Sequence, residues 1–258
     1  MFPKMLTSAI GAGCAAWLLA AVLHFAFVQK YILLGEEYET GAAVHYAGVA
    51  PADGHDAAAT DADDTHAASE EGHSHDGAEA GHDHADGEEV STVTRNLWTT
   101  VFFGLVYVAY ALILVAGFGL ARVYGKVITA REGLLWGIAG FAAFQLAPAM
   151  GLAPELPGTL AADLGTRQVW WWGTVAATIA ALGLLGYGRS LLTVALAVVL
   201  LALPHIIGAP ELEGFSGVAP PEVAGAFAAR VLGVGLAVWA LMGWVAGHLW
   251  AKGTDTTA

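Results

Sequence analysis

Charged residues divide this chain into long uncharged stretches. Six of these stretches contain between 21 and 26 residues each, and the charges that bound them are Lys4 and Lys30, Arg95 and Arg122, Glu132 and Glu155, Arg167 and Arg189, Arg189 and Glu211, and Arg230 and Lys252. A helix needs about 20 apolar residues to cross a hydrocarbon core about 30 Å thick. The pattern therefore predicts an all-α protein, a polytopic membrane bundle of six transmembrane helices that forms a single membrane domain over residues 1–258.

The composition excludes several other classes of protein. Hydrophobic residues make up 57% of the chain and only 13% of the residues are charged, against about 25% in a typical soluble domain. A net charge of −13 would repel the phosphates of a nucleic acid, so we expect no nucleic acid as a partner. The apolar composition makes the lipid bilayer the expected partner. The single cysteine, Cys14, excludes a disulfide framework and a cysteine-based zinc cluster. The apolar run continues for 15 residues beyond Cys14, so we expect it to remain as a helix rather than to be cleaved as a signal peptide.

The distribution of cations predicts an orientation. If the N-terminus is cytoplasmic, six cations fall on the cytoplasmic side, namely Lys4, Arg122, Lys126, Arg131, Arg189 and Lys252, and four fall on the outer side. An excess of cations on the cytoplasmic side is typical of membrane proteins. We therefore expect an integral protein of the cytoplasmic membrane with both termini in the cytoplasm. In this orientation 21 of the 23 acids lie on the outer side.

A long acidic segment rich in histidine lies between the first two predicted helices. Residues 31–94 contain 16 acids and seven of the ten histidines, and they contain no Lys or Arg. Few large apolar residues follow Tyr46, so the segment cannot bury enough surface to fold alone. We expect residues 41–93 to form an extracytoplasmic loop inserted between helices one and two, disordered between residues 50 and 90.

Histidine pairs in this loop indicate metal binding. One residue separates the two histidines of each pair, at positions 73 and 75 and again at 82 and 84, so both rings of a pair can chelate one ion. Neutral imidazole is a common ligand of transition metals, and carboxylates add oxygen ligands. We expect six histidines of the loop to bind metal: His55, His66, His73, His75, His82 and His84. The alternative for this segment is a solubilising low-complexity tail.

The second half of the chain contains a repeat. Residues 148–158 and 204–214 are similar at an offset of 56, and six of the eleven positions are identical. Each copy contains prolines that end a predicted helix. We predict that residues 132–188 and 190–251 are repeated helical hairpins and that the two superpose.

Polar residues gather near the outer ends of the predicted spans. His24 lies in helix one, Gln145 near the end of helix three and His205 near the end of helix five, with Glu211 just beyond it. Polar groups inside a bilayer are costly and are functional candidates. Proline-broken backbone is tolerated at membrane depth where it is covered by protein or lines a cavity. We therefore expect a metal site where His205 and His24 converge, with Gln145 or Glu211 nearby; the alternative for both histidines is a structural role.

Three segments resemble the CbtA family of predicted cobalt transporter subunits. They are residues 27–39, FVQKYILLGEEYE, residues 146–158, LAPAMGLAPELPG, and residues 203–210, LPHIIGAP. Asp163 and residues 167–170, RQVW, follow the second segment. The resemblance covers nearly the whole chain outside the histidine-rich loop. It implies a polytopic membrane protein linked to cobalt uptake for cobalamin synthesis, and a small membrane partner, CbtB, with histidines of its own.

These features predict a membrane subunit of a divalent transition-metal uptake system, with cobalt as the favoured metal and nickel or zinc as alternatives. The close histidine pairs lie in the loop rather than on helices, so we do not expect an enzyme. We expect no permanently bound cofactor, because the metal is the substrate. The chain has no Walker A motif, so we do not expect it to hydrolyse ATP. The alternative function is a membrane protein that buffers or senses metal without transporting it.

Overall fold

The computed structural model describes residues 2–45, 91–212, 214 and 217–255. Its elements are α1 (Phe2–Leu23), η1 (His24–Val28), α2 (Gln29–Glu39), α3 (Thr92–Val123), α4 (Ala130–Phe141), η2 (Ala142–Leu146), α5 (Ala147–Ala149), α6 (Leu164–Tyr187), α7 (Leu191–Ile207) and α8 (Pro221–Asp255). The described residues contain no strand, and the all-α class is confirmed. η1 and η2 are π-helical turns that join α1 to α2 and α4 to α5, so the elements form six continuous helical rods.

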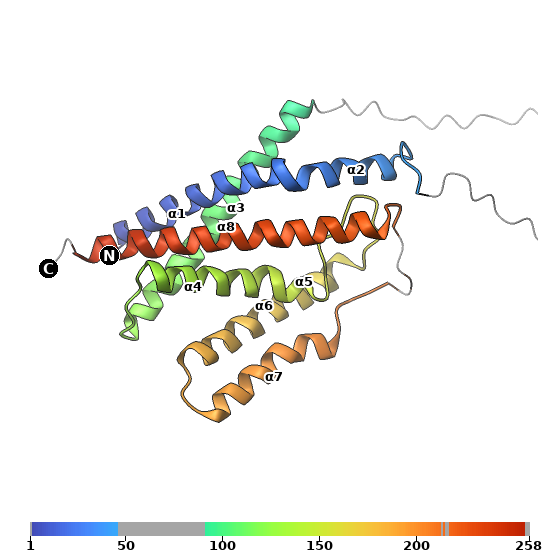
Figure 1. Cartoon of the computed structure of the whole chain (residues 1–258). Helices are drawn as coiled ribbons and strands as arrows, with labels where there is room; N and C mark the ends of the chain where they lie inside the picture. Colours follow the sequence, from blue (N-terminus) through green and yellow to red (C-terminus); the bar gives the residue numbers. More distant parts are fainter. Residues whose placement is uncertain (1, 46–90, 213, 215–216, 256–258) are drawn as a thin grey trace, which may run out of the picture.

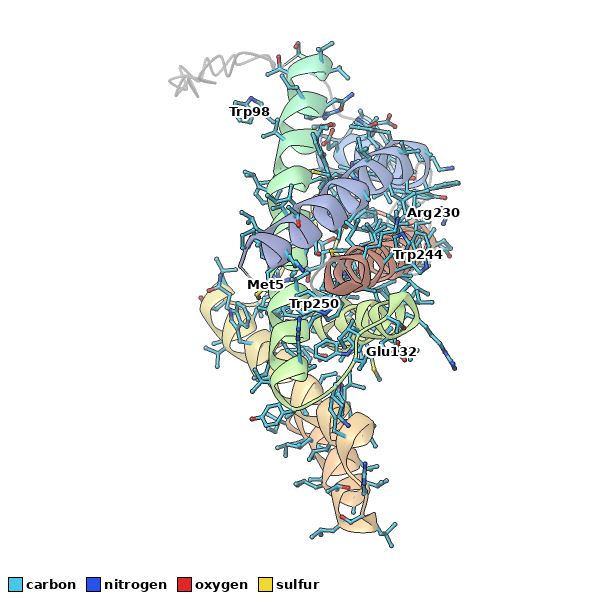
Figure 2. The ribbon with its side chains drawn as sticks, turned by 90° about the vertical axis from the view of Figure 1, so that its left-hand side faces the viewer. Met5, Trp98, Glu132, Arg230, Trp244 and Trp250 are labelled. Carbon is cyan, nitrogen blue, oxygen red and sulfur yellow. The ribbon has the colours of Figure 1, made fainter. Side chains whose placement is uncertain are left out.

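Four of the rods form a central bundle. α8 lies between α1 and α4, and α3 crosses α1 at a steep angle (Figure 1). The main core lies where these helices meet, and Phe118, Trp239 and Met242 are its largest fully buried side chains. α6 and α7 form a hairpin beside α4 and η2, and within the described chain α7 packs against α6 alone. Viewed after a 90° turn, α3 is a long rod that extends beyond the bundle at the top, while the α6–α7 hairpin extends below the other end of α3 (Figure 2).

Glycines allow α4 and α8 to touch. Gly133 and Gly137 of α4 face Gly243 and Gly247 of α8, and a Cβ atom at any of these positions would collide with the backbone of the opposite helix. Small residues four positions apart are typical of closely packed membrane helices. This contact fixes α4 against α8 and thereby holds η2 beside α8.

Capping side chains set the helix ends near the turns. α4 begins with a capping box formed by Thr129 and Glu132, and α7 begins with one formed by Ser190 and Thr193. These side chains satisfy backbone N–H groups that have no partner within the helix. Gly208, with a φ of +86°, follows α7, and the left-handed conformation that it adopts is accessible to glycine at little cost.

The described chain has two distinct ends. The first residues of α1, the last residues of α8 and the turns at 124–129 and 188–190 lie at one end (Figure 1). The end of α2, the loop at 150–163 and the start of α8 lie at the other. The six cations that the sequence analysis assigned to one side of a membrane are therefore all located at the first end of the molecule.

Four of the rods are long and apolar enough to cross a membrane, by length and composition: Pro3–Glu39, Thr92–Val123, Leu164–Tyr187 and Pro221–Lys252. α7 is equally apolar but shorter, with 17 residues. The rod formed by α4, η2 and α5 is not among these four. The described residues therefore form the six helical rods that were predicted, and the four long apolar rods are consistent with a membrane bundle, while six complete spans stay a prediction.

The pairing of helices bears on the repeated hairpins. α4 packs against α8, and α6 packs against α7. If the hairpins 132–188 and 190–251 are equivalent, α4 corresponds to α7 and α6 corresponds to α8. The contact of α4 with α8 then corresponds to the contact of α7 with α6. Their salt bridges differ, however. Glu155 accepts from Arg167 at 2.8 Å, whereas the guanidinium of Arg230 lies over the ring of Tyr31. Superposition of the two hairpins stays a prediction.

Candidate functional site

Two of the predicted polar residues lie in the π-helical turns. His24 is the first residue of η1 and Gln145 lies within η2. Both turns contact α8. π-helical turns are rare inside α-helices and frequently mark functional sites. The structure therefore adds an independent reason to regard the surroundings of His24 and Gln145 as the candidate site.

Pro148 explains the position of η2. Proline has no backbone N–H, and its ring clashes with the carbonyl four residues earlier in an α-helix. η2 ends at Leu146, just before Pro148, and the wider turn moves that carbonyl away from the ring. Pro148 itself is fully buried. The sequence LAPA thus produces the irregular turn that holds Gln145.

The amide of Gln145 is in an unusual environment. Its Oε1 atom is buried and has no hydrogen-bond partner, and it lies against Gly235 of α8. Glycine is required at position 235 for this contact, because a Cβ atom there would collide with Oε1. One turn further along α8, the indole Nε1 of Trp239 is also buried without a partner. Unsatisfied buried polar atoms destabilise a fold by about 1–3 kcal/mol each, so this part of the core is poorly satisfied in its polar contacts.

The ring of His24 lies among aromatic side chains. It contacts Phe103 of α3 edge to face, with ring centroids 5.0 Å apart. From Phe103 the ring contacts continue through Tyr107 and Tyr110 to Phe144, which neighbours Gln145. A row of aromatic rings thus connects the two π-helical turns through the core.

Polar contacts are formed by α2, which follows η1 directly. The side-chain amide of Gln29 donates to Oδ1 of Asn96 at 2.7 Å, and Arg95 donates to Glu36 at 2.9 Å. These contacts join α2 to the start of α3. They fix the rod that carries His24 against α3.

His205 lies in a different place. Its ring contacts Trp170 of α6 edge to face, with centroids 6.0 Å apart, and the indole of Trp170 donates to the carbonyl of Pro204 at 3.1 Å. Glu211 is exposed. Because α7 contacts α6 and no element that carries His24, the structure does not bring His24 and His205 together. Gln145 and His24 share α8 as a neighbour instead.

The described residues contain no group of three or more His, Cys, Asp or Glu side chains that could hold a metal ion. Six predicted metal ligands, His55, His66, His73, His75, His82 and His84, lie outside the described residues. The imidazole of His24 and the unpartnered amide oxygen of Gln145 are polar groups that the two π-helical turns carry.

The sequence model of a family described as "Probable cobalt transporter subunit (CbtA)" matches residues 2–251. This chain belongs to the CbtA family. The resemblance found in the three segments is thus confirmed, and it extends over nearly the whole chain. No curated protein and no solved structure matches this chain.

Membership of the CbtA family has two consequences. The family is one of transporter subunits rather than of enzymes, and the word subunit implies a partner in a complex. The features that the sequence analysis missed are Gly235 and Trp239, since one glycine and one tryptophan in an apolar helix give no signal until their neighbours are known.

Proposed function

We propose that this CbtA protein is the membrane subunit of a cobalt uptake system and that its histidine-rich segment captures the metal. The family match over residues 2–251 is the observation that carries this proposal. Seven histidines and 16 acids between residues 31 and 94 support the capture step, because imidazole and carboxylate suit borderline divalent metals. Such a site is unselective, and the same ligands would bind nickel or zinc.

The path through the membrane follows α8 between the two π-helical turns. Three observations support this assignment: both turns contact α8, His24 begins one of them, and the unpartnered Oε1 of Gln145 lies in the other. Irregular helical backbone leaves polar groups available to a passing ion. In this account His24 and Gln145 act directly on the metal, while His205 supports the α6–α7 hairpin through its contact with Trp170.

The cations at one end of the molecule support an orientation with both termini in the cytoplasm. The histidine-rich segment is then extracytoplasmic, where it would bind the metal before the metal enters the path along α8. The partner implied by the family name would be a small membrane protein of the CbtB type.

A membrane protein that only buffers or senses metal is the alternative function. It would share the histidine-rich segment but would have no need of a path. Uptake of radiolabelled cobalt into proteoliposomes, with and without the partner subunit, distinguishes the two. Transport predicts metal inside the vesicles that external chelator cannot remove, whereas buffering predicts bound metal that chelator removes completely.

A further inference from the structure

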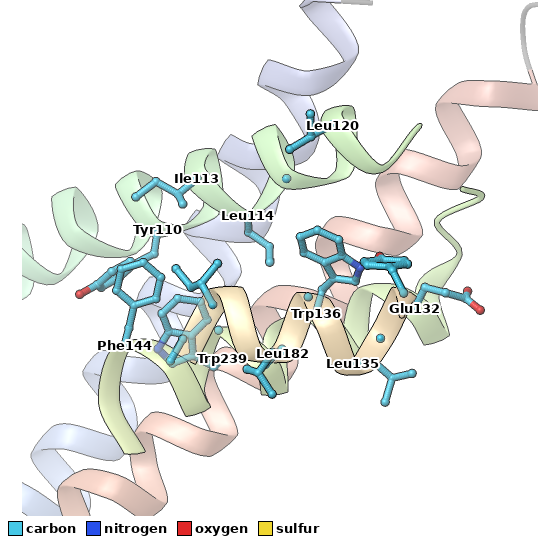
Figure 3. Close-up of a pocket in the computed structure, with 18 residues that line it drawn as sticks. Tyr110, Ile113, Leu114, Leu120, Glu132, Leu135, Trp136, Phe144, Leu182 and Trp239 are labelled. Carbon is cyan, nitrogen blue, oxygen red and sulfur yellow. The ribbon is translucent and has the colours of Figure 1, made fainter. Parts of the chain in front are cut away.

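A cavity opens between α3 and α6 at the end of the molecule that carries the termini. Its volume is about 570 Å³, within the range of about 300–1,000 Å³ that is typical of ligand pockets. α4 forms its floor with Trp136 and Leu135, while Ile113 of α3 and Leu182 of α6 line its sides (Figure 3). α3 and α6 do not contact each other, so the cavity separates the bundle from the hairpin.

The cavity is open to its surroundings and almost entirely apolar. Ile113, Leu120 and Leu135 line it, yet each keeps at least half of its surface exposed. Gly183 of α6 also lines it, and a Cβ atom there would meet no neighbour within 4 Å. Within a bilayer, such an opening faces acyl chains.

The depth of the cavity corresponds to one leaflet. Its α3 residues run from Tyr110 to Leu120, which is about 15 Å of helix and half of a hydrocarbon core about 30 Å thick. A transmembrane helix of a partner would need a groove along the whole core. An acyl chain of one leaflet needs only this half.

A cation lies at the mouth of the cavity. The Nζ atom of Lys126 lies 5.1 Å from the ring centre of Tyr187, and this ring lines the mouth. Lys126, Arg122 and Arg131 are exposed, and none of them forms an ion pair with a described residue. Glu132, the acid that lines the mouth, is engaged with Thr129 in the capping box of α4.

We propose that this cavity binds an anionic phospholipid, with one acyl chain between α3 and α6 and the phosphate at Lys126. Apolar depth and a cationic mouth are the two features that such a lipid requires, since basic pockets between membrane helices bind anionic head groups. The cavity is also lined by Phe144, next to Gln145 in η2, and by Trp239 of α8, so the lipid would border the proposed metal path. It would fill the gap beside α6 and stabilise the hairpin, which has few other contacts with the bundle.

Native mass spectrometry of the full-length chain, with equal amounts of phosphatidylglycerol and phosphatidylcholine that carry identical acyl chains, tests the proposal. We expect one phosphatidylglycerol to be retained in preference to phosphatidylcholine. Lys126→Gln should lower this preference about fivefold. Lys252→Gln removes a cation at the same end, in the last turn of α8, that does not line the cavity, and it should leave the preference unchanged. Equal retention of both lipids by the unmodified chain, or equal effects of the two substitutions, would overturn the proposal.

Two glycine substitutions test the apolar part of the site. Gly183→Leu should fill the cavity and abolish retention of the lipid. Gly173→Leu is the matched control, because it lies on the same helix, has equally open surroundings and does not line this cavity. Undiminished lipid retention by Gly183→Leu would contradict the proposal. In membranes, a Gly183→Cys chain that carries Cys14→Ser and cross-links to the partner subunit would identify a protein occupant and would also overturn it.

Discussion

Gln145 of η2 places its amide oxygen against Gly235 of α8, where residue 235 has no side chain and the oxygen has no hydrogen-bond donor. A glutamine whose buried oxygen has no hydrogen-bond donor lowers the stability of the fold. A fold optimised for stability alone would place an apolar side chain of similar size there. The pair is therefore the clearest sign that this part of the bundle serves a function.

Gln145→Met should separate function from stability. Methionine has a similar length and no unsatisfied oxygen, so we expect the free energy of unfolding in mixed micelles to rise by about 1 kcal/mol. Cobalt uptake should fall at every metal concentration, because the path loses its oxygen ligand. Unchanged uptake in the more stable variant would show that Gln145 is not part of the path.

Gly243→Ala should destabilise the bundle. A Cβ atom at this position collides with the backbone of α4 at Gly133 and Gly137, and overpacking of a close contact costs about 1–3 kcal/mol. Gly233→Ala on the same helix is the control, because its surroundings are open. Denaturant unfolding should therefore show a lower free energy of unfolding for Gly243→Ala but not for Gly233→Ala. Equal stabilities of the two variants would contradict the close packing of α4 and α8.

Substitution of the two histidines of the helices should have different effects. His24→Ala should reduce cobalt uptake at all metal concentrations, since His24 lies at a π-helical turn beside α8. His205→Phe keeps a ring against Trp170 and should preserve uptake. If His205→Phe abolished uptake while His24→Ala did not, the path would have to be moved to the α6–α7 hairpin.

Metal capture should depend on pH. Only neutral imidazole binds metal, and its ordinary pKa is about 6.5, so protonation displaces the metal as the pH falls through this value. Equilibrium dialysis with cobalt should show high occupancy of the full-length chain at pH 7.5 and little at pH 5.5. Equal occupancy at the two pH values would exclude the histidines as the capturing ligands.

Much of the fold follows from charge spacing. The uncharged stretches located all six rods, because a charge inside a bilayer is too costly to be placed at random. Tryptophan near a helix end is typical of the membrane surface. Trp98 and Trp172 are exposed, whereas Trp250 is buried against Phe118. An interfacial and a packed tryptophan have the same sequence signature near a helix end, and only the neighbouring helix distinguishes them.

The arrangement of the rods could not be read from the sequence. His24 and His205 share the same chemistry, but the contact of α4 with α8 and the outlying position of α7 separate them. Gly133 and Gly243, which determine the first of these contacts, are two of 33 glycines. Their role depends on which backbone approaches them.

The concentration dependence of cobalt uptake tests the central claim most directly. Proteoliposomes would contain the partner subunit and either the full-length chain or a chain that lacks residues 50–90. If the histidine-rich segment captures metal for a separate path along α8, the deletion should weaken uptake at scarce cobalt and leave the rate at saturating cobalt unchanged. Loss of uptake at saturating cobalt as well would contradict this account, because the segment would then be part of the path itself.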